Sequence, residues 1–92
     1  MEISFDPGKR AWTLAERQLD FAHAGRIFEG VTLTQEDDRV AYPEPRFQTY
    51  GWLGGRLVLV LVVWTPTETG IRVISMRNCH DEESRRIVPR LG

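Results

Sequence analysis

The 92-residue sequence contains one cysteine and two histidines, and these low counts exclude several classes of protein. The single thiol, Cys79, cannot form an internal disulfide and weakly favours a reducing compartment. Two histidines and one cysteine at unrelated spacings match no zinc motif, so we expect no metal and no cofactor. The longest apolar run, Leu57 to Trp64, is too short to span a membrane, and the N-terminus lacks the features of a signal peptide. We therefore expect a cytoplasmic protein with no membrane partner.

Lysine is almost absent as well, because eleven of the twelve basic residues are arginine. Residues 1–45 carry five basic and nine acidic side chains, whereas residues 46–92 carry seven basic and four acidic ones. The net charge of −1 therefore hides a basic C-terminal half. A protein of nearly neutral net charge binds nucleic acid weakly in general, so a phosphate site would have to be local.

The most informative region is a series of three apolar, β-branched runs separated by turn sequences. The runs cover residues 46–50, 56–65 and 71–77. They predict an antiparallel meander, and Arg46, Arg72 and Arg77 lie at the outer ends of its strands. Guanidinium groups held on a rigid sheet are suited to binding phosphate. We therefore expect the function of the protein to depend on this meander.

The regions on either side of the meander predict helices. Asp6-Pro7 is typical of a helix start, Asp20 can cap a second short helix, and the acidic residues 81–83 before Arg85-Arg86 predict a C-terminal helix beginning near His80 or Asp81. A chain of this length is expected to form a single domain, residues 1–92. We expect an α+β fold in which an antiparallel sheet of four to five strands packs against two N-terminal helices, with a short C-terminal helix.

The aromatic residues divide into two groups. We expect Trp12, Trp64 and Phe28 to pack in the core: Trp12 and Phe28 belong to the apolar stripes of the two expected helices, and Trp64 to the apolar run 56–65. Trp52, at the tip of the first hairpin, is not expected to be wholly buried and is a candidate contact for a partner or for RNA bases.

Several blocks of the chain resemble the BrnT family of toxins from bacterial type II toxin-antitoxin systems. Phe5-Asp6-Pro7-Gly8-Lys9 is similar to the family's opening F-x-W-D-P-x-K, and the segment around Phe21-Ala22 and Ile27-Phe28 is similar to S-F-x-x-A-x-x-V-F. Residues 44–51 and 55–60 match further blocks, and residues 71–77 followed by Glu83 resemble I-R-I-I-S-A-R with a glutamate six residues on. The family's N-x-x-K-H-G corresponds here to a segment ending in Glu16-Arg17-Gln18, which lacks the histidine.

The resemblance implies a fold like that of the RelE ribonuclease toxins and an activity that cleaves RNA and halts translation. It implies a BrnA-like antitoxin with a ribbon-helix-helix region, and contact with operator DNA only through that antitoxin. Whether the chain forms a homodimer stays open.

RNA cleavage by the adjacent 2′-hydroxyl needs no metal, but it needs a proton acceptor, a proton donor and cations for the phosphorane. Arg46, Arg72 and Arg77 suit the cationic role because a guanidinium binds phosphate oxygens bidentately. Proton transfer then falls to Glu44, His80 or Glu83. In a regular strand Arg72 and Arg77 face opposite sides, unless a bulge intervenes or Arg77 lies beyond the strand end. We add four candidate RNA-binding residues: Lys9, Arg17, Arg56 and Trp52.

Three alternatives stay open. The arginines could instead pair with nearby carboxylates as surface salt bridges. The chain could be a catalytically weakened or inactive antitoxin-binding module of the same fold, as the replacement of the family's Lys-His-Gly by Glu16-Arg17-Gln18 permits. It could also be a relative with a RelE-like fold that acts on a protein rather than on RNA.

Overall fold

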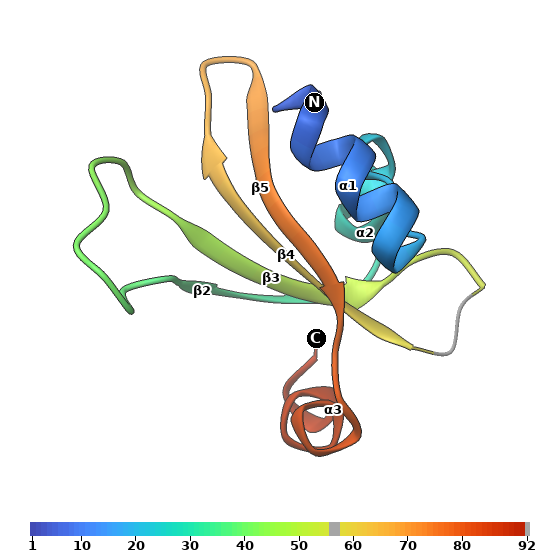
Figure 1. The fold of residues 1–92 in the computed structure, drawn as a ribbon. Coiled ribbons are helices and arrows are strands. Elements are labelled where there is room, and N and C mark those ends of the chain that lie inside the picture. Colours follow the sequence, from blue (N-terminus) through green and yellow to red (C-terminus); the bar gives the residue numbers. More distant parts are fainter. Residues whose placement is uncertain (56–57, 92) are drawn as a thin grey trace.

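The structure is a computed structural model that describes residues 1–55 and 58–91. It has an α+β fold in which a sheet of five strands is accompanied by three α-helices and two 3₁₀ segments (Figure 1). The elements in chain order are β1 (Glu2–Phe5), α1 (Pro7–Arg17), η1 (Phe21–His23), α2 (Ala24–Phe28), β2 (Thr32–Glu36), β3 (Phe47–Trp52), β4 (Leu59–Pro66), β5 (Gly70–Asn78), α3 (Asp81–Ile87) and η2 (Val88–Arg90).

The sheet is mixed rather than antiparallel, which corrects the sequence-based expectation. Its strand order is β1-β5-β4-β3-β2, and β2 to β5 form the predicted antiparallel series. β1 adds to the outer edge of β5 in parallel, with Glu2 opposite Gly70. A Cβ atom at Gly70 would collide with the Glu2 backbone, so this glycine permits the close approach of β1.

A β-bulge in β5 changes which side chains share a face of the sheet. Trp64 pairs with Val73 but the preceding Val63 pairs with Ser75, so Ile74 is an extra residue. Val73 and Met76 consequently belong to the same core cluster although they are three positions apart. Beyond Ile74, the alternation of β5 side chains between the two faces of the sheet is shifted by one residue.

The helices α1 and α2 and the segment η1 cover one face of the sheet, which we call the helix-covered face. The side chains of its buried core are Leu19, Phe21, Ala24, Ile27, Leu53, Val60, Val62, Ile71, Val73 and Met76. The predicted helix starts are confirmed, because Asp6 accepts a hydrogen bond from the Lys9 backbone N–H at 2.9 Å and Asp20 accepts one from that of Ala22 at 2.9 Å.

The expectation that Trp12 packs in the core is wrong. Trp12 is 55% exposed and Leu14 is 42% exposed, and the buried residue of α1 is Thr13. The space over the sheet is filled instead by Leu19 and Phe21, which follow α1 and are almost fully buried. The core prediction is confirmed for Trp64 and Phe28, which are partly buried against the helix-covered cluster and meet edge to face.

The opposite face of the sheet has a smaller core at the end where α3 lies (Figure 1). Its buried members are Tyr50, Leu59, Leu61, Val63, Cys79 and Ile87. Cys79 is a free, buried cysteine in this cluster. α3 begins at Asp81 as predicted, with His80 as its N-cap residue and no capping bond from the imidazole.

Candidate functional site

The bulge at Ile74 places Arg72 and Arg77 on the same face of the sheet. Ile71, Val73 and Met76 point to the helix-covered core, so the arginines that adjoin them in β5 point to the other side. The sequence allowed Arg72 and Arg77 to share a face if a bulge lay between them, and the structure has that bulge. We call this side of the sheet the arginine face.

Arg46 lies on the arginine face as well. Phe47, the next residue, stacks on Trp64 of the helix-covered core, so alternation turns Arg46 the other way. Thr65 pairs with Arg72, and its hydroxyl donates to the carbonyl of Pro45 at 2.6 Å. Arg46, Thr65 and Arg72 therefore form a row across neighbouring strands, at the end of the sheet away from α3.

Arg77 belongs to a different part of this face, a polar cavity of about 430 Å³. Its lining residues are Gln35, Glu36, Asp37, Asp38, Arg39, Gln48, Tyr50, Arg77, Glu83 and Arg86. The three arginines in this list come from the loop after β2, from β5 and from α3. We call it the polar cavity, and its three arginines lie among four carboxylates, Glu36, Asp37, Asp38 and Glu83.

Sequence reasoning missed Arg39 and Arg86 as members of this cavity. Arg86 could have been found, because it follows Glu83 by three residues and so shares a side of α3 with it. Arg39 carries no such signal, since its place depends on how the loop after β2 folds back on the sheet.

Arg77 and Glu83 form a bidentate ion pair on the arginine face. The Arg77 guanidinium donates to both carboxylate oxygens of Glu83, at 2.7 and 2.9 Å. These hydrogen bonds lower the pKa of Glu83 to about 2 and raise that of Arg77. At neutral pH Glu83 is thus ionised and a weak base, which suits it to orient Arg77.

Arg46 is held more loosely. Its guanidinium donates to Glu44 at 3.2 and 3.3 Å and lies over the ring of Tyr42, 4.1 Å from the centroid. The Glu44 side chain is 37% exposed, so water screens this pair more than the Arg77–Glu83 pair, where the carboxylate is 12% exposed.

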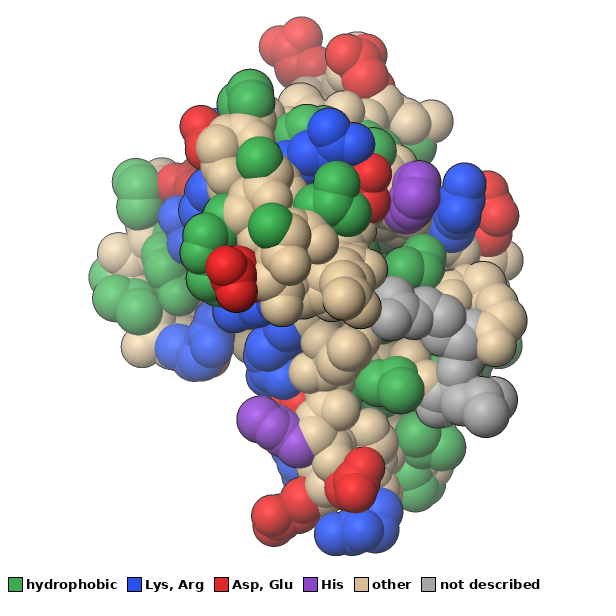
Figure 2. Space-filling view, turned by 45° about the vertical axis from the view of Figure 1, so that its right-hand side comes forward, with side chains coloured by type: hydrophobic (Ala, Val, Ile, Leu, Met, Phe, Trp, Pro, Cys, Tyr) green, Lys and Arg blue, Asp and Glu red, His purple; other side chains and the backbone are tan. Residues whose placement is uncertain are grey.

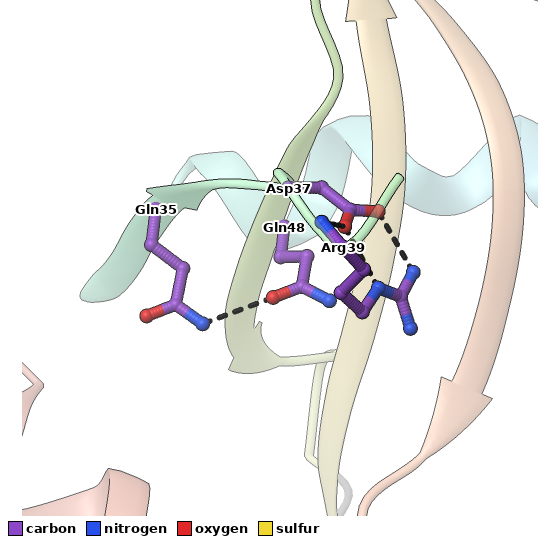
Figure 3. A network of polar contacts seen from close by, with 4 residues as sticks. All are labelled: Gln35, Asp37, Arg39 and Gln48. Atoms are coloured by element: carbon purple, nitrogen blue, oxygen red, sulfur yellow. Dashed lines mark hydrogen bonds and ion pairs between the residues drawn. The ribbon is translucent and has the colours of Figure 1, made fainter. Parts of the chain in front are cut away.

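Arg39 is fixed at the mouth of the polar cavity by a buried carboxylate. Figure 3 shows Asp37 facing the Arg39 guanidinium beside Gln48, which accepts a hydrogen bond from Gln35. The Asp37–Arg39 contacts are both 2.7 Å, and the Asp37 side chain is completely buried. The hydrogen bonds from Arg39 hold the pKa of Asp37 below its usual value.

His80 lies at the rim of the polar cavity. It lines a neighbouring hollow together with Glu82, Glu83 and Arg86, and the last two also line the polar cavity. His80 is exposed, and its imidazole is not used to cap α3.

Two buried groups near Glu83 are held in their protonated forms. Burial raises the pKa of Tyr50, and it raises the pKa of the Cys79 thiol to about 12. Such a thiol is not a nucleophile at neutral pH. Tyr50 lines the polar cavity as a neutral hydrogen-bonding group.

The candidate RNA-binding residues lie elsewhere. Lys9 and Arg17 line a groove beside α1, and Trp52 is 36% exposed at the end of β3. Arg56 lies outside the described residues. Eight of the predicted residues thus form three groups: Arg46 with Glu44 and Arg72 at one end of the arginine face, Arg77 with Glu83 and His80 at the other, and Lys9 with Arg17 beside α1. Trp52 belongs to none of these groups. Figure 2 shows basic side chains along the narrow part of the molecule between the helical layer and α3.

Neither a metal site nor a membrane helix is found where the chain is described. Residues 1–55 and 58–91 contain no cluster of three or more carboxylate, histidine or cysteine side chains able to hold a metal ion. No helix within those ranges has the length and apolar character needed to cross a bilayer.

Comparison with known proteins identifies the family. The family model described as the ribonuclease toxin BrnT of type II toxin-antitoxin systems matches residues 5–83. No curated protein matches the sequence. The matched segment begins at Phe5, the last residue of β1, contains Arg46, Arg72 and Arg77, and ends at Glu83, before Arg86 of the polar cavity. A toxin of such a system implies an antitoxin partner. The chain belongs to the BrnT family of ribonuclease toxins.

Proposed function

We propose that this protein is an endoribonuclease that cleaves RNA without a metal ion and so inhibits translation. The observation that carries the proposal is the β-bulge at Ile74, which puts Arg72 and Arg77 on one face of the sheet together with Arg46. Cations on one rigid surface can hold successive phosphates of a single strand. The proposal includes a fold related to RelE, a cytoplasmic location and a BrnA-like ribbon-helix-helix antitoxin that carries the contacts to operator DNA.

The reaction that fits this surface is attack by the 2′-oxygen of RNA on the adjacent phosphorus. The bond to the 5′-oxygen breaks, which leaves a 2′,3′-cyclic phosphate and a 5′-hydroxyl. A base takes the proton of the 2′-hydroxyl, an acid protonates the leaving oxygen, and cations stabilise the phosphorane. The protein supplies each of these groups from its own side chains.

We assign the cationic role to Arg46, Arg72 and Arg77, and proton transfer to His80 or Glu44. Glu83 fits proton transfer less well, because Arg77 lowers its pKa to about 2 and a carboxylate of that pKa retains a proton poorly at neutral pH. Glu83 instead fixes the guanidinium of Arg77 through two hydrogen bonds. It is therefore a positioning residue in this proposal.

Expression of the protein without its antitoxin tests the proposal. We expect growth arrest with fragmented cellular RNA, and we expect Arg72→Ala to lower cleavage by about 100-fold or more, as removal of one transition-state donor does. Arg72 is exposed, so this substitution should leave the fold intact. Arg26→Ala, an exposed arginine of α2 on the other side of the sheet, is the matched control and should remain toxic.

The second candidate function is an antitoxin-binding module that has lost its chemistry. It is favoured by the pairing of Arg46 with Glu44 and of Arg77 with Glu83, which occupies two of the three guanidinium groups. Normal growth at high soluble expression of the unaltered protein, combined with antitoxin binding, would establish this function and refute the nuclease.

A further inference from the structure

The groove beside α1 combines features that neither the core nor the arginine face explains. Its volume is about 460 Å³, and it lies between α1 and the bulge of β5. β1 pairs with β5 only as far as Val73, so the edge of β5 from Ile74 onward borders the groove instead of another strand. Cavities of roughly 300 to 1,000 Å³ hold small organic ligands, a range that includes one nucleotide.

Trp12 is the large exposed side chain of this groove. Its indole is 55% exposed, although a chain of this size needs most of its large apolar residues in the core. The Arg17 guanidinium lies 5.1 Å from the ring centroid and donates to the Met76 carbonyl at 2.8 Å. The hydrogen bond fixes Arg17 against one face of the indole, so a planar ligand would stack on the other face.

The charges along the groove favour a polyanion. Lys9 and Arg17 line it from the same helix, eight positions apart, a separation of about 12 Å along the axis. The one carboxylate in the lining, Asp6, already accepts the backbone N–H of Lys9 as the helix cap. An aromatic ring between two cations is the arrangement that binds unpaired bases with their phosphates.

The exposed lining of the groove is mainly apolar, and Trp12 is the one large apolar side chain of that lining that is more than half exposed. Phe21 and Thr13, which line the groove, are 1% and 4% exposed, and Ile74 is only partly exposed. A docking helix or strand would therefore find little apolar surface in the groove besides Trp12. A single-stranded nucleic acid needs only the ring and the two charges.

We propose that this groove binds an unpaired nucleotide of the RNA substrate, with its base stacked on Trp12 and the neighbouring phosphates on Lys9 and Arg17. This inference rests on the proposed nuclease function and extends it. Arg17 contacts the backbone of Met76, and the next residue, Arg77, lines the polar cavity. An RNA strand that leaves the groove at Arg17 therefore passes the edge of β5 and reaches the arginine face.

The test measures binding separately from cleavage. The probe is a fluorescent single-stranded RNA of ten uridines whose 2′-oxygens are methylated, so that the attacking hydroxyl is blocked. We expect Trp12→Ala to weaken binding about tenfold and Lys9→Ala to weaken it severalfold with a smaller salt dependence. Leu14→Ala is the matched control, because Leu14 is also an exposed apolar residue of α1 but does not line the groove, and it should bind as the unaltered protein does. Trp12→Phe, which keeps an aromatic ring, should recover most of the affinity.

A probe containing abasic positions identifies the stacking contact itself. Removal of bases should weaken binding to the unaltered protein about tenfold but should change binding to Trp12→Ala little, because the ring that they stack on is already missing. Equal affinity of Trp12→Ala and Leu14→Ala for the methylated RNA, or no measurable binding by the unaltered protein, would overturn the inference. Loss of antitoxin binding in Trp12→Ala with RNA binding unchanged would also overturn it and would make the groove a protein-docking surface.

The two proposals fail in different ways. If the methylated RNA binds through Trp12 but unmodified RNA stays intact, the nuclease function is wrong while the nucleotide groove stands. If unmodified RNA is cleaved equally well by Trp12→Ala and by the unaltered protein at limiting RNA concentration, the groove is wrong while the nuclease stands.

Discussion

The two faces of the sheet differ in what their side chains do, although the same strands build both. The helix-covered face is filled by a continuous apolar cluster, and its polar groups hold elements together. The arginine face has a smaller apolar core near α3, and the rest of it carries guanidinium groups, some paired with carboxylates and some exposed. Truncation of the buried side chains of the first face should therefore cost stability, whereas removal of an exposed guanidinium group from the second should cost activity.

The largest difference should appear between Phe21→Ala and Arg72→Ala. Phe21 is 1% exposed and meets Phe5 edge to face, so its truncation leaves a cavity in the core. We expect a loss of about 3 to 5 kcal/mol in the free energy of unfolding, against a total of about 5 to 15 kcal/mol for a domain. Arg72→Ala should change that free energy by less than about 0.5 kcal/mol. Urea unfolding followed by circular dichroism measures both, and a comparable loss in the two variants would contradict the division between the faces.

Asp20 and Glu83 are carboxylates on opposite sides of the sheet, and each is paired with an arginine. Asp20 accepts two hydrogen bonds from Arg10, which lower its pKa to about 2, and Glu83 has a pKa of about 2 because of Arg77. Since the pKa of each carboxyl is depressed by folding, each pair stabilises the protein above about pH 4.5 and loses that effect as the pH falls towards 2. For the Arg77–Glu83 pair the contribution is about 1 to 2 kcal/mol after allowance for solvent screening, and the more exposed Arg10–Asp20 pair acts in the same direction.

Asp20→Asn and Glu83→Gln should therefore each flatten the dependence of stability on pH between about pH 4.5 and 2. The two should differ in activity, because Glu83 orients Arg77 on the arginine face whereas Asp20 fastens α1 to η1 on the other side. We expect RNA cleavage at neutral pH to fall only in Glu83→Gln. Unfolding at several pH values and a cleavage assay separate these effects, and equal cleavage by the two variants would show that Glu83 has no positioning role.

A smaller effect should distinguish two neighbouring residues of β3. Thr49 is fully buried on the helix-covered face, where its hydroxyl accepts the Trp64 indole N–H at 2.8 Å and contacts the Thr34 hydroxyl at 2.8 Å. Thr49→Val removes that oxygen without changing the volume much and should cost about 1 to 2 kcal/mol, because the indole N–H is left without its partner. Gln48→Ala should cost less, since Gln35, its partner on the arginine face, can turn to water. Chemical unfolding of both variants checks the order.

The parts of the fold that could be predicted from the sequence are those decided by nearby residues. Asp6 and Asp20 cap helices as expected, because a carboxylate needs only the next few backbone N–H groups. Helical spacing could not tell that Trp12 faces outward, because the side of α1 that is buried depends on Leu19 and Phe21 filling the space above the sheet.

The candidate site also combines contacts that nearby residues decide with contacts that depend on distant parts of the chain. The contact between Arg77 and Glu83 is almost local, across a strand-to-helix junction, and salt bridges between the arginines and nearby carboxylates were one of the alternatives that the sequence left open. The bulge at Ile74 depends on the register between β4 and β5, and the entry of Arg39 into the polar cavity depends on a loop folding back over the sheet. Neither is decided by residues close in sequence, which is why the arrangement of the arginines could be predicted only in outline.

The smallest effect concerns the end of α1, where this chain departs from its family. Gln18 is the one non-glycine residue with a positive φ, 59°, among residues 1–55 and 58–91, and it occupies the position where the family motif ends in glycine. A left-handed conformation costs a residue with a Cβ atom about 1 to 2 kcal/mol, whereas the greater freedom of glycine in the unfolded chain costs about 0.4 to 1 kcal/mol. Gln18→Gly should therefore stabilise the protein by about 0.5 kcal/mol. Gly54→Ala, at φ 60° with nothing within 4 Å of the added Cβ, is the reverse substitution and should destabilise it by a similar amount. Thermal unfolding of the two variants tests the sign. A loss of stability in Gln18→Gly would mean that the glutamine side chain stabilises the end of α1 by more than its backbone conformation costs.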